Sequence, residues 1–236
     1  STRGILRDLN VFYETKIDNQ IFKNNIDKFN FKFTNKAEAA CPKITFLKID
    51  IETIPNKYNG LLESYFNDLD NKKNNFFTDV SNYISYETGQ PTHCYDASKL
   101  HQGIKLDFTN KSKKFKTLLD KEIELESGSL VFYDKKDKII NLAGVVGGDD
   151  TSCNKNTKSV IVECAYFNPE AIIGKCVKYS INSEAAHKFE RHVDPDCHEY
   201  VIRRFIKIIE EHSNIQNIES CSYEYKYNQF NNNNDI

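Results

Sequence analysis

The chain of 236 residues contains no methionine and no tryptophan, and it has only nine glycines and five prolines. It has no apolar run close to the roughly 20 residues that a membrane-spanning helix needs, and no stretch typical of a secretory leader. We therefore expect no contact with a membrane. The missing initiator and the start at Ser1 predict a piece cut from a longer polypeptide.

Excess charge of either sign is also lacking, since 32 Lys and Arg nearly balance 34 Asp and Glu. This balance gives no overall attraction for nucleic acid, so contact with a polyanion would depend on local basic patches or on a partner. The seven cysteines are odd in number and form no C-x-x-C pair, which favours a reducing cytoplasm over a disulfide framework. His187, His192, Cys197 and His198 lie close in sequence, but no upstream pair has finger-like spacing, so we expect no metal.

The pattern of apolar residues predicts a β-rich middle flanked by helices. Strands are expected over residues 44–51, 104–108, 116–119, 123–125, 129–133, 139–146 and 159–167. Helices are expected over residues 4–11, 61–69, 77–86 and 200–209, with a further one capped by Asn168 and begun by Pro169. Residues 24–40 are polar and irregular, and the tail from Asn228 to Asp235 is expected to be disordered. The predicted class is α+β.

The most informative segment is a strand that ends in the glycine-rich turn LAGVVGGD, residues 142–149, followed by the apolar strand SVIVECAYF, residues 159–167. Gly147 and Gly148 let a ligand approach the backbone closely because no Cβ intervenes. Glu163 is the one acid in its apolar run, and a buried carboxylate is costly unless a polar group meets it. The pattern predicts a pocket with a bare backbone wall and one anionic acceptor. An ordinary turn and a strand residue facing water is the open alternative.

Two further segments contain side chains that can take part in catalysis. Over residues 79–96, a helix with a hydroxyl and an amide, Ser81 and Asn82, leads into a proline-containing turn that presents His93. A later segment begins with Ser183. Each has a structural alternative: His93 can be a buried structural residue, Ser81 and Asn82 can be cap or turn residues, and Ser183 can be a helix N-cap.

These segments, in this order, resemble the central module of the bacterial phenylalanyl-tRNA synthetase β subunit, the site that hydrolyses tyrosine mistakenly attached to phenylalanine tRNA. The family motifs are V-T-N-Y, G-Q-P-x-H-x-F-D, L-A-G-x-x-G-G, E-[CS]-A-x-F and [ST]-[DE]-A-S-x-R-[FY]-E-R-G-V-D-P. The corresponding residues here are 80–83, 89–96, 142–148, 163–167 and 183–195. The opening STRGILRDL is similar to the family's S-x-R-G-I-A-R-E-L, and the resemblance extends to about residue 215.

The departures from these motifs fall into two groups. Ser81 replaces the usual threonine and Ser183 occupies a position that is Thr or Ser, so both keep the hydroxyl. Ala186 replaces a serine, Lys188 an arginine and His192 a glycine. The second group concerns the tRNA-facing surface and local packing more than the pocket.

The resemblance implies a β-sandwich-like core of unusual topology with surrounding helices. It implies an editing module over residues 1–215, followed by a terminal strand and a disordered polar tail over 216–236. The implied partners are the 3′ end of tRNA(Phe) and the synthetase α subunit in a cytoplasmic heterotetramer. ATP and magnesium serve the parent enzyme, and no cofactor is implied for this module.

The resemblance also implies roles for single residues. Glu163 would accept a hydrogen bond from the tyrosine phenol, since an ionised carboxylate only accepts. Gly147, Gly148 and Ala185 would line the substrate pocket. The residues implied at the ester, where they would position water and the terminal ribose, are His93, Ser81, Asn82 and Ser183. Because the ester is already activated, orientation and polarisation can suffice without a nucleophilic triad.

Two other functions stay open from the sequence. One is a structural and docking module of the same synthetase that has lost editing. The other is a free-standing module of the same fold that acts on another ligand. Retention of His93, Glu163, the paired glycines and a hydroxyl at Ser183 favours editing over the docking module. The missing initiator favours editing over the free-standing module.

Overall fold

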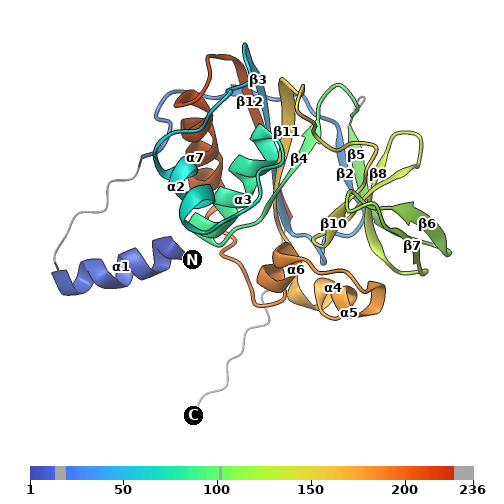
Figure 1. Cartoon of the computed structure of the whole chain (residues 1–236). Coiled ribbons are helices and arrows are strands. Elements are labelled where there is room, and N and C mark those ends of the chain that lie inside the picture. Colours follow the sequence, from blue (N-terminus) through green and yellow to red (C-terminus); the bar gives the residue numbers. More distant parts are fainter. Residues whose placement is uncertain (14–19, 101–102, 226–236) are drawn as a thin grey trace.

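The computed structural model describes residues 1–13, 20–100 and 103–225. Two five-stranded sheets face each other, and helices cover the outer face of the first sheet (Figure 1). The first sheet has the order β1 (Asp27–Lys28), β12 (Ile215–Glu224), β3 (Lys43–Ile51), β11 (Ser159–Tyr166) and β4 (Thr92–Asp96). The second has the order β10 (Val146–Gly147), β9 (Ile139–Leu142), β8 (Leu130–Asp134), β5 (Ile104–Phe108) and β2 (Phe33–Asn35). A hairpin of β6 (Lys113–Lys116) and β7 (Glu122–Leu125) projects from the second sheet.

Alternation along the central strand β11 explains why the first sheet has two apolar faces. Val160, Val162 and Cys164 point to the helices, whereas Ile161 and Ala165 point to the second sheet. Each set belongs to a separate cluster of buried side chains. A strand that is covered on both faces has an almost continuous apolar sequence, and residues 159–167 show this pattern. Glu163, on the face toward the second sheet, is the one charged residue in that run.

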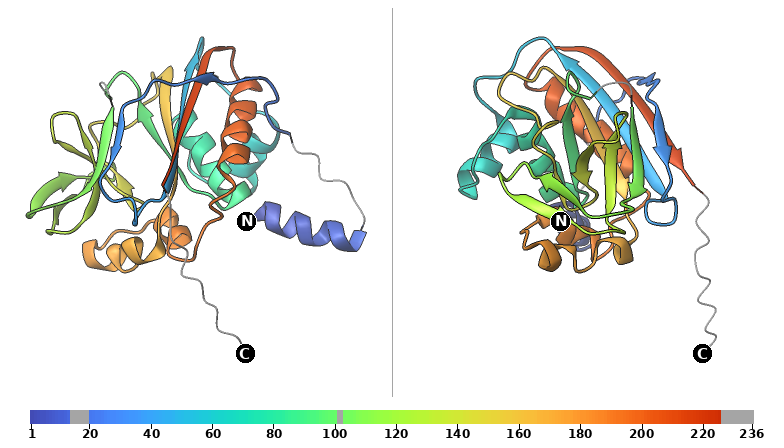
Figure 2. Two further views of the ribbon diagram at one scale, coloured as in Figure 1. Left: turned by 180° about the vertical axis from the view of Figure 1, so that it is seen from behind. Right: turned by 90° about the vertical axis from the view of Figure 1, so that its right-hand side faces the viewer.

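The helices form two groups and one projecting helix, which Figure 2 shows from two further sides. Those packed on the first sheet are α2 (Gly60–Asp68), α3 (Phe76–Thr88) and α7 (His198–Glu210). Those gathered near one end of the two sheets are α4 (Pro169–Ile172), α5 (Lys175–Tyr179) and α6 (Glu184–Phe189). The remaining helix, α1 (Thr2–Tyr13), extends from the body and has no buried residue.

Helix boundaries follow the local chemistry of the sequence. The Asn75 side chain accepts a hydrogen bond from the backbone N–H of Thr78 and so begins α3. Gly89 ends α3 with φ of 84°, in the left-handed region that glycine adopts at low cost. Asn168 caps α4 and Pro169 opens it, as predicted.

The structure confirms the α+β class and most of the predicted elements, with four corrections. The single strand expected over 139–146 is wrong, because β9 ends at Leu142, a turn follows, and β10 pairs back antiparallel onto β9. The strand expected over 116–119 is wrong, because β6 ends at Lys116 and Thr117 begins a turn in which Asp120 takes φ of 56°. The turn expected to present His93 is instead the strand β4, which pairs with β11. The irregular stretch 24–40 contains the short strands β1 and β2, whose parallel partners β12 and β5 lie far along the chain.

The C-terminal region contributes to the first sheet. β12 runs antiparallel along nearly all of β3. The division of the chain at residue 215 stays a prediction, and the tail over 226–236 lies outside the described residues. No helix among the described residues has the length and apolar character that crossing a membrane requires.

Candidate functional site

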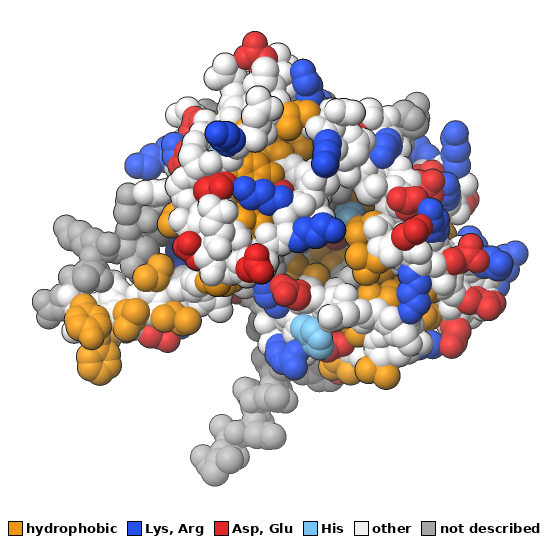
Figure 3. Space-filling view, in the orientation of Figure 1, with side chains coloured by type: hydrophobic (Ala, Val, Ile, Leu, Met, Phe, Trp, Pro, Cys, Tyr) orange, Lys and Arg blue, Asp and Glu red, His pale blue; other side chains and the backbone are white. Residues whose placement is uncertain are grey.

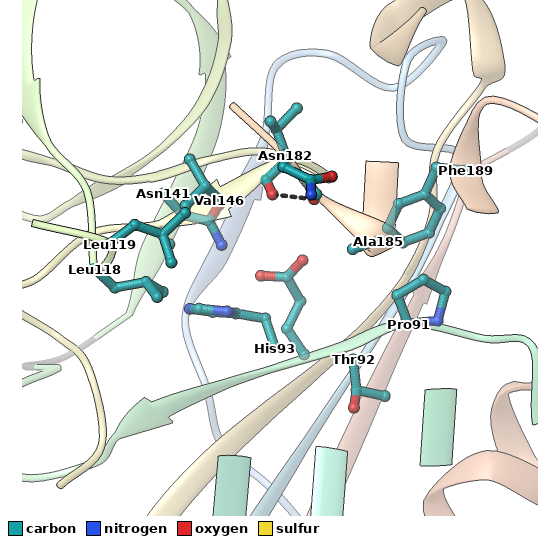
Figure 4. Close-up of a pocket in the computed structure, with 15 residues that line it drawn as sticks. Pro91, Thr92, His93, Leu118, Leu119, Asn141, Val146, Asn182, Ala185 and Phe189 are labelled. Carbon is teal, nitrogen blue, oxygen red and sulfur yellow. Dashed lines mark hydrogen bonds between the residues drawn. The ribbon is translucent and has the colours of Figure 1, made fainter. Parts of the chain in front are cut away.

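A cavity of about 200 Å³ lies where β4, β11, β9 and β10 meet α6. Figure 4 shows Leu118, Leu119, Asn141 and Val146 along one side of it and Pro91, Ala185 and Phe189 along the other. Asn182 lies opposite His93 and Thr92. Its wall also includes Gly144, Val145, Gly147, Glu163 and Ser183. The structure therefore brings five of the eight predicted site residues to one cavity: His93, Gly147, Glu163, Ser183 and Ala185.

Strand pairing places the two titratable groups of the cavity side by side. Glu163 of β11 lies directly opposite His93 of β4 in the antiparallel register. Directly opposite residues in such a pair project their side chains from the same face of the sheet. Both therefore face the second sheet, where the cavity lies.

The Glu163 carboxylate is buried, with 4% of the residue exposed, and it is held by a hydrogen-bond chain. The Tyr95 hydroxyl donates to Glu163 Oε2 at 2.6 Å, and Asn141 Nδ2 donates to the Tyr95 oxygen at 2.9 Å. Burial raises the pKa of Glu163 to about 7, and the bond from Tyr95 opposes this rise. The carboxyl group is therefore a mixture of neutral and ionised forms near neutral pH.

His93 is a neutral imidazole at physiological pH. Burial lowers its pKa to about 4, because charge is disfavoured away from water. Its ring packs edge to face against Tyr95, with centroids 4.4 Å apart. Its Nε2 has no hydrogen-bond partner among the described residues. A neutral ring with a free nitrogen suits positioning of a water molecule or a substrate hydroxyl better than proton abstraction.

Gly147 and Gly148 have different structural roles. A Cβ on Gly147 would lie 2.7 Å from His93 Nε2 and 2.8 Å from Leu118 Cδ2, so only glycine leaves room there. The carbonyl of Gly147 also accepts from the Leu118 N–H at 2.9 Å, which holds the 118–119 turn over the cavity. A Cβ on Gly148 would lie 2.8 Å from the Ile140 carbonyl oxygen. Gly148 therefore serves close packing of the second sheet and does not line the cavity.

Ser183 is the N-cap of α6 and is already bonded twice. Its Oγ accepts from the Ala186 N–H at 3.2 Å and donates to the Val145 carbonyl at 2.6 Å. These bonds tie the start of α6 to the turn before β10. The helix in turn places Ala185 and Phe189 on the cavity wall. The geometry thus gives Ser183 the capping role that the sequence left open as an alternative.

Ser81 and Asn82 do not line this cavity. The Ser81 Oγ donates to the Thr92 carbonyl at 2.8 Å, on the helix side of β4. Both residues line an adjoining cavity of about 290 Å³, which shares Pro91, Thr92 and Ala185 with the first. Seven of the eight predicted site residues are therefore divided between two neighbouring cavities, and Gly148 lines neither.

Several residues in the cavity wall or directly behind it were not predicted from the sequence. Tyr95 stands where the motif G-Q-P-x-H-x-F-D has phenylalanine, so a signal for it was present in the sequence. Phe189 likewise stands at the [FY] position of the last motif. Asn141 and Asn182 carried no comparable signal, since each is an isolated polar residue in an ordinary segment. Within the described ranges, no three His, Cys, Asp or Glu side chains cluster closely enough to hold a metal ion, and all seven cysteines are free.

Comparisons with known proteins identify the family to which the chain is similar. The B3/4 domain family matches residues 54–214. The phenylalanine–tRNA ligase β subunit of Francisella tularensis is 38% identical over 137 residues, which is 58% of this chain and 17% of that protein. The β subunit of Colwellia psychrerythraea is 37% identical over 131 residues, 56% of this chain and 16% of that protein. The chain thus spans about a sixth of the length of these curated relatives.

A solved structure shares the fold. It is an N-terminal fragment of the phenylalanyl-tRNA synthetase β subunit from Pyrococcus horikoshii, with a TM-score of 0.53 and 12% sequence identity. The match covers 95% of this chain and 60% of that fragment. At this identity the likeness concerns the arrangement of sheets and helices.

Proposed function

The chain belongs to the B3/4 domain family, as found in phenylalanyl-tRNA synthetase β subunits, and from that premise we propose that its cavity hydrolyses the ester of tyrosyl-tRNA(Phe). The observation that carries the proposal is Glu163: a buried carboxylate at the wall of a mainly apolar, ring-sized cavity. The cavity volume of about 200 Å³ exceeds the roughly 150 Å³ of an apolar cavity that accommodates benzene. It therefore has room for an aromatic side chain.

A second site is needed because a synthetic pocket for phenylalanine discriminates poorly against tyrosine. A hydrophobic pocket rejects a molecule that merely adds a hydroxyl by only about 10²-fold. A site that hydrogen-bonds the hydroxyl can reject the molecule lacking it by about 10⁴–10⁵. Glu163 supplies such a site, since a phenylalanine ring would displace water from the carboxylate and give no bond in return.

The adjoining cavity suits the other end of the substrate. It is lined by polar groups that include Ser81, Asn82 and Thr92, and it meets the first cavity at Pro91 and Ala185. With the amino-acid ring in the first cavity, the ester and the terminal ribose would lie near this junction. The neutral His93 ring, which lies against Gly147 and Leu118 across the first cavity from that junction, would position water from its own side, and orientation of an activated ester would supply the rate.

The proposed partners are those that the resemblance to the synthetase implies. In the parent enzyme the proposed partners are the 3′ end of tRNA(Phe) and the α subunit, in the cytoplasm, with ATP and magnesium used elsewhere in that enzyme. The net charge of −2 predicts weak affinity of this chain alone for tRNA, since phosphate contacts supply most of such binding.

A docking role is the second candidate function, and α1 favours it. The apolar side chains of this helix are exposed: Ile5, Leu6, Leu9, Val11, Phe12 and Tyr13. Figure 3 shows them as an apolar cluster on the projecting helix. Exposed apolar patches of this kind mark contact sites in assemblies. Docking and editing use different parts of the chain and are compatible.

The test fills the cavity in the full synthetase. Gly147→Ala would place a methyl group against the His93 ring, so hydrolysis of preformed tyrosyl-tRNA(Phe) should fall by more than tenfold while phenylalanine charging continues. Gly174→Ala is the matched control: its φ of 78° makes alanine strained, but no atom lies within 4 Å of the new Cβ. Full hydrolysis by Gly147→Ala, with folding intact, would place the reaction elsewhere.

A further inference from the structure

Three buried polar side chains form one directed chain behind the cavity. Exposure is 0% for Tyr95, 3% for Asn141 and 4% for Glu163. The amide nitrogen of Asn141 can only donate, so the Tyr95 oxygen accepts from it at 2.9 Å. The single proton of the Tyr95 hydroxyl then goes to Glu163 Oε2, at 2.6 Å. With Glu163 ionised, each group thus has one direction of donation, and the chain ends on the carboxylate.

We propose that Tyr95 is a positioning residue for substrate selection: its hydroxyl, oriented by Asn141, fixes Glu163 by one carboxylate oxygen and leaves the other for a phenol in the cavity. The inference rests on the proposed function and adds to it the group that makes Glu163 an acceptor. Among the described residues, Tyr95 alone donates a hydrogen bond to Glu163.

Tyr95 is placed so that it can bond the Glu163 carboxylate from outside the cavity. Tyr95 and His93 lie two residues apart on β4 and so share the face toward the second sheet. Glu163 lies opposite His93, which makes Tyr95 its diagonal neighbour across the strand pair. His93, Glu163 and Asn141 line the cavity, whereas Tyr95 does not. Tyr95 therefore reaches the carboxylate without occupying the space that a substrate ring would fill.

The hydrogen bond also acts on the charge of Glu163. Burial favours the neutral carboxyl group, and the donated bond favours the ionised one, which lowers its pKa. An ionised carboxylate is the form that offers acceptor positions only. Removal of the Tyr95 hydroxyl should therefore raise the pH at which Glu163 ionises by about one to two units, the value of a charge-assisted hydrogen bond.

Among the described residues, no positively charged side chain next to Glu163 stabilises its ionised form. The titratable groups that adjoin Glu163 or feel its charge are His93, Cys94 and Tyr95 on β4, Cys164 on β11 and Cys41 before β3. The strands β9 and β10 contribute no titratable side chain. The titratable groups of α6 line other cavities: Glu184, His187 and Lys188. Tyr95 is thus the one group that stabilises the charged form.

The first experiment measures the ionisation of Glu163 without needing catalysis. Unfolding free energies of this chain are compared with those of Glu163→Gln from pH 5 to pH 10, in the wild-type and the Tyr95→Phe backgrounds. The difference between Glu and Gln should level off near the pH at which Glu163 ionises in the folded state. In the Tyr95→Phe background this levelling-off should move up by about one to two pH units.

Tyr179→Phe is the matched control. It also loses a buried tyrosine hydroxyl, which bonds to the Ser129 Oγ at 2.7 Å. Its loss of stability should leave the Glu163 titration where it was. An unchanged titration in Tyr95→Phe, or an equal displacement in Tyr179→Phe, would overturn the proposal.

The second experiment uses the full synthetase and separates this inference from the proposed function. The ratio of tyrosyl- to phenylalanyl-tRNA(Phe) hydrolysis is measured against pH for wild type and Tyr95→Phe. If wild type is selective and the profile of Tyr95→Phe moves to higher pH, the result supports both the proposed function and the role of Tyr95. Wild-type selectivity with an undisplaced profile overturns the role of Tyr95 alone. Absence of hydrolysis by wild type overturns the proposed function, and the stability titration then decides the role of Tyr95.

Discussion

Ionisation of Glu163 should weaken the fold, and Glu163→Gln should remove that effect. Burial raises the pKa of this carboxyl group from 4.5 to about 7 in the folded chain. Between these two pH values the folded state binds more protons than the unfolded state, so stability falls as pH rises. At about 1.36 kcal/mol per pH unit, the loss reaches about 3 kcal/mol above pH 7. The contribution is fully present below pH 4.5 and lost as pH rises through about 7.

The assay is denaturant unfolding at pH 4.5, 6, 7 and 8 for wild type and Glu163→Gln. The Gln variant keeps an oxygen that accepts from Tyr95 and carries no charge. Its unfolding free energy should rise relative to that of wild type by about 3 kcal/mol between pH 4.5 and pH 8. Two buried histidines act in the opposite sense: burial lowers the pKa of His93 and of His198 to about 4, so their contribution is lost as pH falls below 6.5.

These histidines are present in both proteins, so their contribution cancels in the comparison. A difference between wild type and Glu163→Gln that is flat with pH would refute the reasoning. So would a difference that shrinks as pH rises, because it would mean that a positive group stabilises the carboxylate in the folded chain.

Three further predictions concern the frame of the site and its chemistry. Arg204→Ala should lower the unfolding free energy by about 3–5 kcal/mol. The reason is that the Arg204 side chain is 4% exposed and bonds Glu87 through two nitrogens. A loss below about 1 kcal/mol in denaturant unfolding would contradict this. Ser183→Ala should cost about 1 kcal/mol and slow hydrolysis by displacing α6, and Ser183→Thr should restore both. The pH–rate profile of hydrolysis should show no step that belongs to His93, because burial lowers the pKa of His93 to about 4. The step near pH 7 that Glu163 produces should therefore persist in His93→Asn, and a step that His93→Asn removes would contradict this.

The sequence predicted those features that depend on local pattern. Periodicity located β3, β11, α3 and α7, because each buries a face against the same core over several turns or pleats. It failed at β1 and β2, which are two or three residues long and gain their partners from β12 and β5. It also failed at β4, where Gly-Gln-Pro signals a turn but pairing with β11 continues the chain as a strand.

The candidate site shows the same division. Glu163 could be singled out because an acid within an apolar strand is unusual, and Gly147 because its turn contains paired glycines. The bond between Tyr95 and Glu163 could not, because it joins diagonal neighbours in a strand pair whose register the sequence does not state. Ser81 is implied at the ester by resemblance, but the sequence does not show that its Oγ bonds to Thr92 on the helix side of β4. Side-chain direction at such positions is set by tertiary packing.

The most direct test of the central claim is the selectivity of hydrolysis in the parent synthetase. Preformed tyrosyl-tRNA(Phe) and phenylalanyl-tRNA(Phe) are incubated with wild type and with Glu163→Ala, under conditions in which both enzymes still charge phenylalanine. The account predicts rapid release of tyrosine by wild type, with phenylalanine released at least about 100-fold more slowly. In Glu163→Ala that difference should disappear. Wild-type hydrolysis that does not distinguish the two esters, or selectivity that survives in Glu163→Ala, would contradict the account.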